Sequence, residues 1–138
     1  MQYANVLVFI LGLCTLAYAK TPLYVDSHCP DAVGTVVVYN FKEAVSGSSI
    51  YRPLQDQRDG VVVHLVCVAA DSDTSQDGPQ NDREAAIGLT ITIEKDGREY
   101  YIAHAVYAVG RNQASGLGRE LLAVVDSQVD AYRSWLTP

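Results

Sequence analysis

Two histidines are the residues of this chain whose type and placement are best suited to acid–base chemistry. His64 lies within the apolar segment 61–70, and His104 lies in a hairpin-like segment close to Arg98 and Glu99. Because an imidazole exchanges protons near neutral pH, two such rings on neighbouring strands can serve as general acid and general base. The spacing does not force the rings together. The alternative is two buried neutral histidines whose ring nitrogens bind local partners.

A polar segment at 71–84 carries oxygen atoms at intervals that could wrap a calcium ion. The side chains at its alternate positions are Asp71, Asp73, Ser75 and Asp77. The EF-hand pattern has glycine at the sixth loop position and glutamate at the twelfth, where this chain has Gln76 and Asp82. We therefore expect a solvated acidic loop here and no metal site.

A glycine-containing string begins at Gln113 and continues through Gly116 and Gly118 into a predicted helix. Over about residues 99–133, this region resembles the Gln/Arg-x-x-Gly-x-Gly loop of the GCN5-related N-acetyltransferases. The resemblance implies that backbone amides at the helix N-terminus hold the pyrophosphate of acetyl-coenzyme A. A flexible turn that enters a helix also explains the two glycines, and on that interpretation the chain holds no cofactor.

The surrounding segments predict an α+β domain with an antiparallel sheet. Segment 61–70 is apolar on both alternating faces, which is typical of a central strand covered on both sides. From Ser115 onward, apolar residues recur at helical spacing, which predicts an amphipathic C-terminal helix packed on one face of the sheet.

The N-terminal half is less regular. Residues 20–31 are polar and contain Pro22 and Pro30, so they predict turns. Residues 33–47 fit both a strand and a helix, and the sequence leaves these alternatives open. A short strand is expected at 49–54.

The clearest local pattern is a hairpin whose turn is Asp96-Gly97, because both turn residues tolerate positive φ. Counting outward from the turn pairs Ile93 with Tyr100, Ile91 with Ile102 and Leu89 with His104. The opposite face is then formed by Thr90, Thr92, Tyr101 and Ala103. This register places His104 on the apolar face of the hairpin.

Residues 1–19 predict a cleavable secretory signal, because the apolar run Val6–Leu16 is followed by small residues at Ala17 and Ala19. Residues 20–138 have the length of a single small domain. The expected product is secreted and extracellular.

Three cysteines occur in the chain, and Cys14 lies within the predicted signal. Cys29 and Cys67 remain, and an oxidising compartment would favour a disulfide between them. The alternative is two buried thiols.

The net charge is −6, from 10 Lys and Arg against 16 Asp and Glu residues. An acidic surface opposes binding to nucleic acid and to anionic lipid, because both are bound through cationic side chains. We therefore expect neither nucleic acid nor a membrane as a partner.

These features favour a secreted interaction protein without catalytic activity that binds another protein. In overall design, a short signal followed by a small acidic domain with few cysteines, the chain resembles candidate effectors that plant-associated fungi release toward host tissue. That resemblance implies virulence-related action on host proteins, outside host cells or inside them after uptake. An exposed aromatic or aliphatic patch would carry the binding, with Tyr24, Tyr51 and Tyr107 as candidates.

Two enzymatic alternatives stay open. Small fungal secreted proteins with a ribonuclease-like fold share the plan of signal, early cysteine, helix and sheet, which implies a hydrolase that uses His64 and His104. The other alternative is an acyltransferase that uses Gly116 and Gly118.

Overall fold

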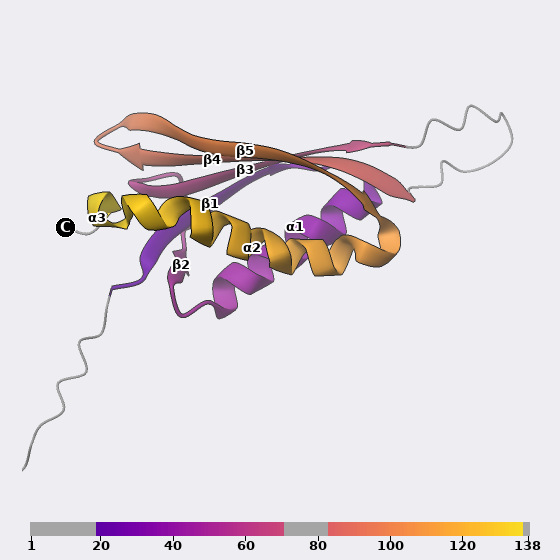
Figure 1. The fold of residues 1–138 in the computed structure, drawn as a ribbon, viewed down its shortest axis with the longest axis horizontal. Coiled ribbons are helices and arrows are strands. Elements are labelled where there is room, and N and C mark those ends of the chain that lie inside the picture. Colours follow the sequence, from indigo (N-terminus) through magenta and orange to yellow (C-terminus); the bar gives the residue numbers. More distant parts are fainter. Residues whose placement is uncertain (1–18, 71–82, 137–138) are drawn as a thin grey trace, which may run out of the picture.

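Five strands form one mixed sheet, and the two longer helices cover one of its faces (Figure 1). The computed structural model describes residues 19–70 and 83–136. The strands are β1 (Thr21–His28), β2 (Tyr51–Pro53), β3 (Gly60–Ala69), β4 (Glu84–Lys95) and β5 (Arg98–Gly110), in the spatial order β2-β1-β3-β4-β5. The predicted α+β fold class is confirmed, but the sheet is mixed and not wholly antiparallel as predicted, because β1 pairs in parallel with β2 and β3.

Helix α1 (Ala32–Gly47) connects β1 to β2, and helix α2 (Ala114–Val129) follows β5. The 3₁₀ turns η1 (Arg111–Gln113) and η2 (Asp130–Tyr132) flank α2, and a short helix α3 (Arg133–Leu136) ends the described chain. The predicted C-terminal helix is thus confirmed. Within the described residues, no helix is both long and apolar enough to cross a membrane.

Residues 33–47, which fit both a strand and a helix in the sequence, lie in helix α1. Asp31 is its N-cap, and Oδ1 of Asp31 accepts a hydrogen bond of 2.5 Å from the backbone N–H of Gly34. Val33, Val37 and Phe41 lie on one face of the helix and are buried in the core. The β-branched residues that fit a strand are tolerated here, because burial of this face outweighs their small loss in helix propensity.

Strand β1 lies where the sequence predicts turns, so that prediction is wrong. Leu23 is fully buried on the helix side, while the polar residues Asp26 and His28 on the other face are exposed. β1 pairs in parallel with both β2 and β3, whereas the β3–β4 and β4–β5 pairs are antiparallel. The parallel pairing follows from α1, which returns the chain so that β2 starts at the same edge as β1.

The predicted hairpin turn is confirmed, with φ of 53° at Asp96 and 70° at Gly97. The register near the turn is also as predicted, because Ile93 pairs with Tyr100. A bulge follows, at which β5 contains one more residue than β4. Beyond it the pairs are Ile91 with Ala103, Thr90 with His104 and Leu89 with Ala105.

The predicted pairs of Ile91 with Ile102 and of Leu89 with His104 are therefore wrong. A slip of one residue moves every later side chain to the other face of a strand. His104 consequently shares a face with Thr90 instead of with the buried Leu89, and this face points away from the helices.

A disulfide joins Cys29 and Cys67, as predicted, with Cα atoms 4.5 Å apart. Cys29 follows β1, and Cys67 is buried on the helix side of β3. The bond therefore fixes the start of α1 to the central strand of the sheet.

Helices α1 and α2 cross closely at Gly118. A Cβ atom at this position would lie 2.6 Å from the carbonyl oxygen of Val37 and 2.7 Å from Cβ of Asn40. Gly116 has open space instead, with nothing within 4 Å of the corresponding position. Both glycines lie inside α2, so the predicted glycine loop ahead of the helix is not formed.

We expect Gly118→Ala to lower the free energy of unfolding by about 1–3 kcal/mol, because the added methyl group meets the α1 backbone. The matched control is Gly116→Ala, which should raise it by about 0.5–1 kcal/mol through helix propensity alone. Urea unfolding of the three proteins measures both values. A Gly118→Ala protein as stable as the wild type would contradict the close crossing.

Removal of the disulfide, as Cys29→Ser with Cys67→Ala, should lower the free energy of unfolding by about 4 kcal/mol. The reason is that the bond closes a loop across a sequence separation of 38 residues in the unfolded chain. Denaturant unfolding with and without a reducing agent tests this. The reductant should destabilise the wild type to a similar degree and leave the double variant unchanged.

Candidate functional site

We call the side of the sheet that faces away from α1 and α2 the outer face (Figure 1). Strand alternation and the observed registers assign its central positions. They are Tyr24, Asp26 and His28 on β1, Val62, His64, Val66 and Val68 on β3, Ala86, Gly88, Thr90, Thr92 and Glu94 on β4, and Glu99, Tyr101, His104, Val106 and Ala108 on β5. None of these positions is Lys or Arg.

One half of the outer face, which we call the polar end, is centred on His64. The imidazole lies between two carboxylates, with Nδ1 3.1 Å from Oδ2 of Asp26 and Nε2 3.0 Å from Oε1 of Glu99. The hydroxyl of Thr92 donates a hydrogen bond of 2.7 Å to the same Glu99 oxygen. Three strands thus converge on one cluster, since Asp26 is on β1, His64 on β3 and Glu99 on β5.

This geometry satisfies both ring nitrogens of His64. In the imidazolium form each nitrogen donates to one carboxylate, which gives two charge-assisted hydrogen bonds. Thr92 and His64 hold the pKa of Glu99 below its ordinary value, the hydrogen bond from Thr92 contributing most. To accept a substrate proton, His64 must first give up one of these two contacts.

His104 lies on the same face but in a separate contact. Its Nδ1 is 2.7 Å from the hydroxyl oxygen of Tyr101, three residues earlier on β5. His64 and His104 both pair opposite Thr90, one from β3 and one from β5. Their backbones are therefore two strand spacings apart, or roughly 9–10 Å, and each imidazole contacts its own partners.

The other half of the outer face exposes aliphatic side chains, and we call Val66, Val68 and Val106 the valine patch. Their exposed fractions are 51%, 62% and 71%. The register makes them neighbours, because Val66 and Val106 both pair with Gly88. Val68 lies in the next row beside the small residue Ala86.

The valine patch corrects the prediction that β3 is covered on both faces along its whole length: Val61, Val62 and Val63 are buried on both faces, but the end of the strand is not. Leu65 and Cys67 are buried on the helix side, whereas Val66 and Val68 between and beyond them are exposed. A continuous apolar run has the same sequence pattern whether one face or both are covered, so the pattern alone could not locate the patch.

The tyrosines that the sequence suggests as anchors do not form the valine patch. Tyr51 is buried, and this burial is the main cause that raises its pKa to about 12, despite the opposing charge of Arg133. Its hydroxyl lies 3.1 Å from Oδ1 of Asp126, so it ties β2 to α2. Tyr24 and Tyr107 are half-buried. Tyr101, which is 62% exposed, is the outer-face tyrosine that is open to solvent.

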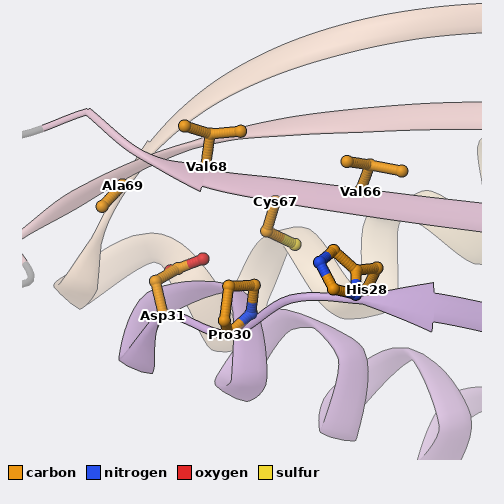
Figure 2. A pocket seen from close by; sticks show the side chains of 7 residues that line it. All are labelled: His28, Pro30, Asp31, Val66, Cys67, Val68 and Ala69. Atoms are coloured by element: carbon orange, nitrogen blue, oxygen red, sulfur yellow. The ribbon is translucent and has the colours of Figure 1, made fainter.

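A shallow hollow of about 520 Å³ adjoins the valine patch at the end of β1 (Figure 2). Its lining residues are His28, Pro30, Asp31, Val66, Cys67, Val68 and Ala69. Figure 2 shows Val66 and Val68 on the opposite side of β3 from Cys67. Val66 and Val68 line the hollow as well as the valine patch, so the two features adjoin.

Among residues 19–70 and 83–136, no group of three His, Cys, Asp or Glu side chains is arranged to hold a metal ion. The calcium candidate formed by Asp71, Asp73, Ser75 and Asp77 lies outside the described residues, as do residues 1–18 of the predicted signal at 1–19.

No family model matches the chain, and no curated protein is significantly similar to it in sequence. Among solved structures, the fold is similar to that of the hypothetical protein CT253 from Chlamydia trachomatis, with a TM-score of 0.55 and 10% sequence identity. The match covers 82% of this chain and 99% of that chain. At this level of identity the similarity shows the fold alone.

Thr92→Val should raise the pKa of Glu99 toward its ordinary value, because it removes the hydroxyl that contributes most to the lowering. Thr90→Val is the matched control on the same face and should leave the pKa of Glu99 unchanged. The titration of side-chain carboxyl resonances by NMR measures both.

The lowered pKa of Glu99 determines how its contribution to stability changes with pH. The folded state favours the charged carboxylate, so the contribution of Glu99 to stability is present above the ordinary pKa and is lost as the pH falls through the folded-state value. Thr92→Val should therefore weaken the dependence of unfolding on pH in this acidic range. Identical titrations of Glu99 in both variants would contradict the assigned role of Thr92.

Proposed function

We propose that this chain is a secreted, non-catalytic interaction protein that binds a protein partner through the outer face of its sheet. The observation that carries the proposal is the valine patch, an uncovered aliphatic region on a rigid sheet. A partner that covers these side chains gains about 25 cal/mol for each Å² of apolar surface removed from water. Contiguous exposed apolar patches on soluble proteins mark interaction sites more often than single exposed residues do.

The charges of the outer face indicate the chemistry of the partner. Asp26, Glu94 and Glu99 lie at the polar end, and none of the central outer-face positions on β1, β3, β4 and β5 is Lys or Arg. The complementary partner surface combines apolar side chains with Lys or Arg.

Secretion and an effector role are part of the same proposal. The Cys29–Cys67 disulfide supports an oxidising destination, because such bonds persist mainly outside the cytosol. The small acidic domain and its uncovered face are consistent with a host protein as the partner. Catalysis by His64 is less favoured, since both of its ring nitrogens already bind carboxylates.

Val106→Lys should abolish partner binding, because it removes an exposed valine and places a cation against a partner rich in Lys and Arg. Val36→Lys is the matched control, since Val36 is exposed on α1, away from the outer face. Proteins captured from host extract by immobilised 20–138 would be purified, and their dissociation constants measured for both variants.

The catalytic alternative is tested separately, by RNA hydrolysis. The proposal expects binding by Val36→Lys within about twofold of the wild type, and binding by Val106→Lys at least about 10-fold weaker. Equal binding by Val106→Lys and Val36→Lys would contradict it. RNA hydrolysis by the wild type that His64→Ala and His104→Ala remove would favour the hydrolase instead.

A further inference from the structure

The sheet ends in two edge strands of very different character. β2 has three residues and contains Pro53, whereas β5 has 13 residues and pairs only on its β4 side within the described chain. An edge strand presents unpaired backbone N–H and C=O groups that can pair with another chain. Short length and proline protect β2 from such pairing, and β5 lacks both protections.

The composition of β5 leaves its edge open. From Tyr100 to Gly110 the strand contains no Lys, Arg, Asp, Glu or Pro, although charges and proline are the usual means of blocking an edge. The bulge near Ile102 is the one edge-blocking feature within this stretch. It does not prevent pairing, because β4 already pairs with β5 along both sides of the bulge.

We propose that the partner contributes an extended segment that adds to β5 as a sixth, antiparallel strand. This inference rests on the proposed function, since it assigns the form of the same partner and the place where it binds. Backbone hydrogen bonds along β5 would provide affinity, and side chains that project onto the outer face would provide specificity. The added strand would extend the valine patch beyond Val106, its most exposed member.

The register of β4 on β5 shows which residues of such a strand project onto the outer face. Successive outer-face residues on the unbulged β4 strand are Gly88, Thr90, Thr92 and Glu94, and they pair with Val106, His104, Tyr101 and Glu99. An added strand in the same direction as β4 therefore meets these four residues at positions p, p+2, p+4 and p+6.

Each position then has a chemical preference. An aliphatic residue at p packs on Val106, and a β-branched residue at p+4 packs on the exposed ring of Tyr101. Lys or Arg at p+6 lies opposite Glu99, which is 46% exposed and negatively charged. The expected recognition pattern is an aliphatic residue followed six positions later by a cation.

A second copy of this chain fits the edge less well. Antiparallel pairing of β5 with itself about a two-fold axis at Ala105 would place Tyr101 opposite Val109. Tyr101 points to the outer face and Val109 is buried on the helix side, because the bulge reverses the alternation between them. A partner strand without a bulge avoids this conflict, as β4 does.

The test uses the domain 20–138 and the capped peptide Val-Thr-Thr-Thr-Val-Thr-Lys. Its controls are the reversed sequence Lys-Thr-Val-Thr-Thr-Thr-Val and the charge-reversed sequence that ends in Glu. Calorimetry should show both controls binding at least about 10-fold more weakly. The Val106→Lys variant should no longer bind the first peptide, and the Val36→Lys variant should still bind it.

Two N-methylated peptides separate strand addition from side-chain binding alone. Methylation at p, p+2 and p+4 and methylation at p+1, p+3 and p+5 block opposite backbone edges of the peptide. Strand addition expects one of them to lose binding and the other to retain it, together with slower amide hydrogen exchange between Tyr100 and Ala108. Equal binding of both methylated peptides without slower exchange would overturn strand addition and leave the proposed function standing.

Failure of the first peptide to bind, or tighter binding of the reversed peptide, would also overturn the proposed antiparallel register. The proposed function is judged separately, by the comparison of Val106→Lys with Val36→Lys against the full partner. The two proposals can therefore fail independently.

Discussion

The packing of both long helices against one face of the sheet is the constraint on which the rest of the molecule depends. α1 and α2 fit side by side because Gly118 lets their backbones approach closely, at a point where any side chain would meet Val37 and Asn40. With both helices on this side, no helix of the described chain covers the other side of the sheet (Figure 1). The outer face is thus a direct consequence of how the core is filled.

The single bulge in β5 decides what the outer face contains. In the unbulged register that the sequence predicts, His104 would lie on the helix side opposite Leu89, and the outer face would lose both His104 and Val106. The same residue lets Tyr101 and His104 occupy consecutive outer-face rows, although three positions separate them. A local change in strand geometry therefore determines the chemistry of a whole surface.

The sequence predicts the elements whose pattern is local and periodic. The turn at Asp96 and Gly97 needs two positive φ angles, and α2 repeats its apolar residues every three to four positions, so the sequence predicts both correctly. The disulfide is also predictable by simple reasoning, because only two cysteines lie outside the predicted signal. The fold class and the C-terminal helix depend on these elements alone.

Features set by tertiary packing are not predictable in the same way. β1 is not recognised as a strand from the sequence, because its outer-face residues Asp26 and His28 are polar, as residues in turns also are. The contact of Asp26 with His64 depends on the parallel β1–β3 pair, which no spacing in the sequence indicates. Nor does the apolar run of β3 reveal that Val66 and Val68 on its outer face are uncovered.

The groups at the polar end already have partners within the described chain, whereas the side chains of the valine patch do not. This difference suggests how a partner would be recognised. At the polar end, Asp26 and Glu99 already have a hydrogen-bond partner in His64, so a partner cation there would contribute more to specificity than to affinity. At the valine patch nothing within the described chain removes the apolar surface from water, so most of the binding energy must come from there. A partner that carried only the cation would bind weakly, and one that carried only the apolar residues would lack a fixed register along β5. Both halves are therefore needed, and β5 is the edge strand that carries residues of both.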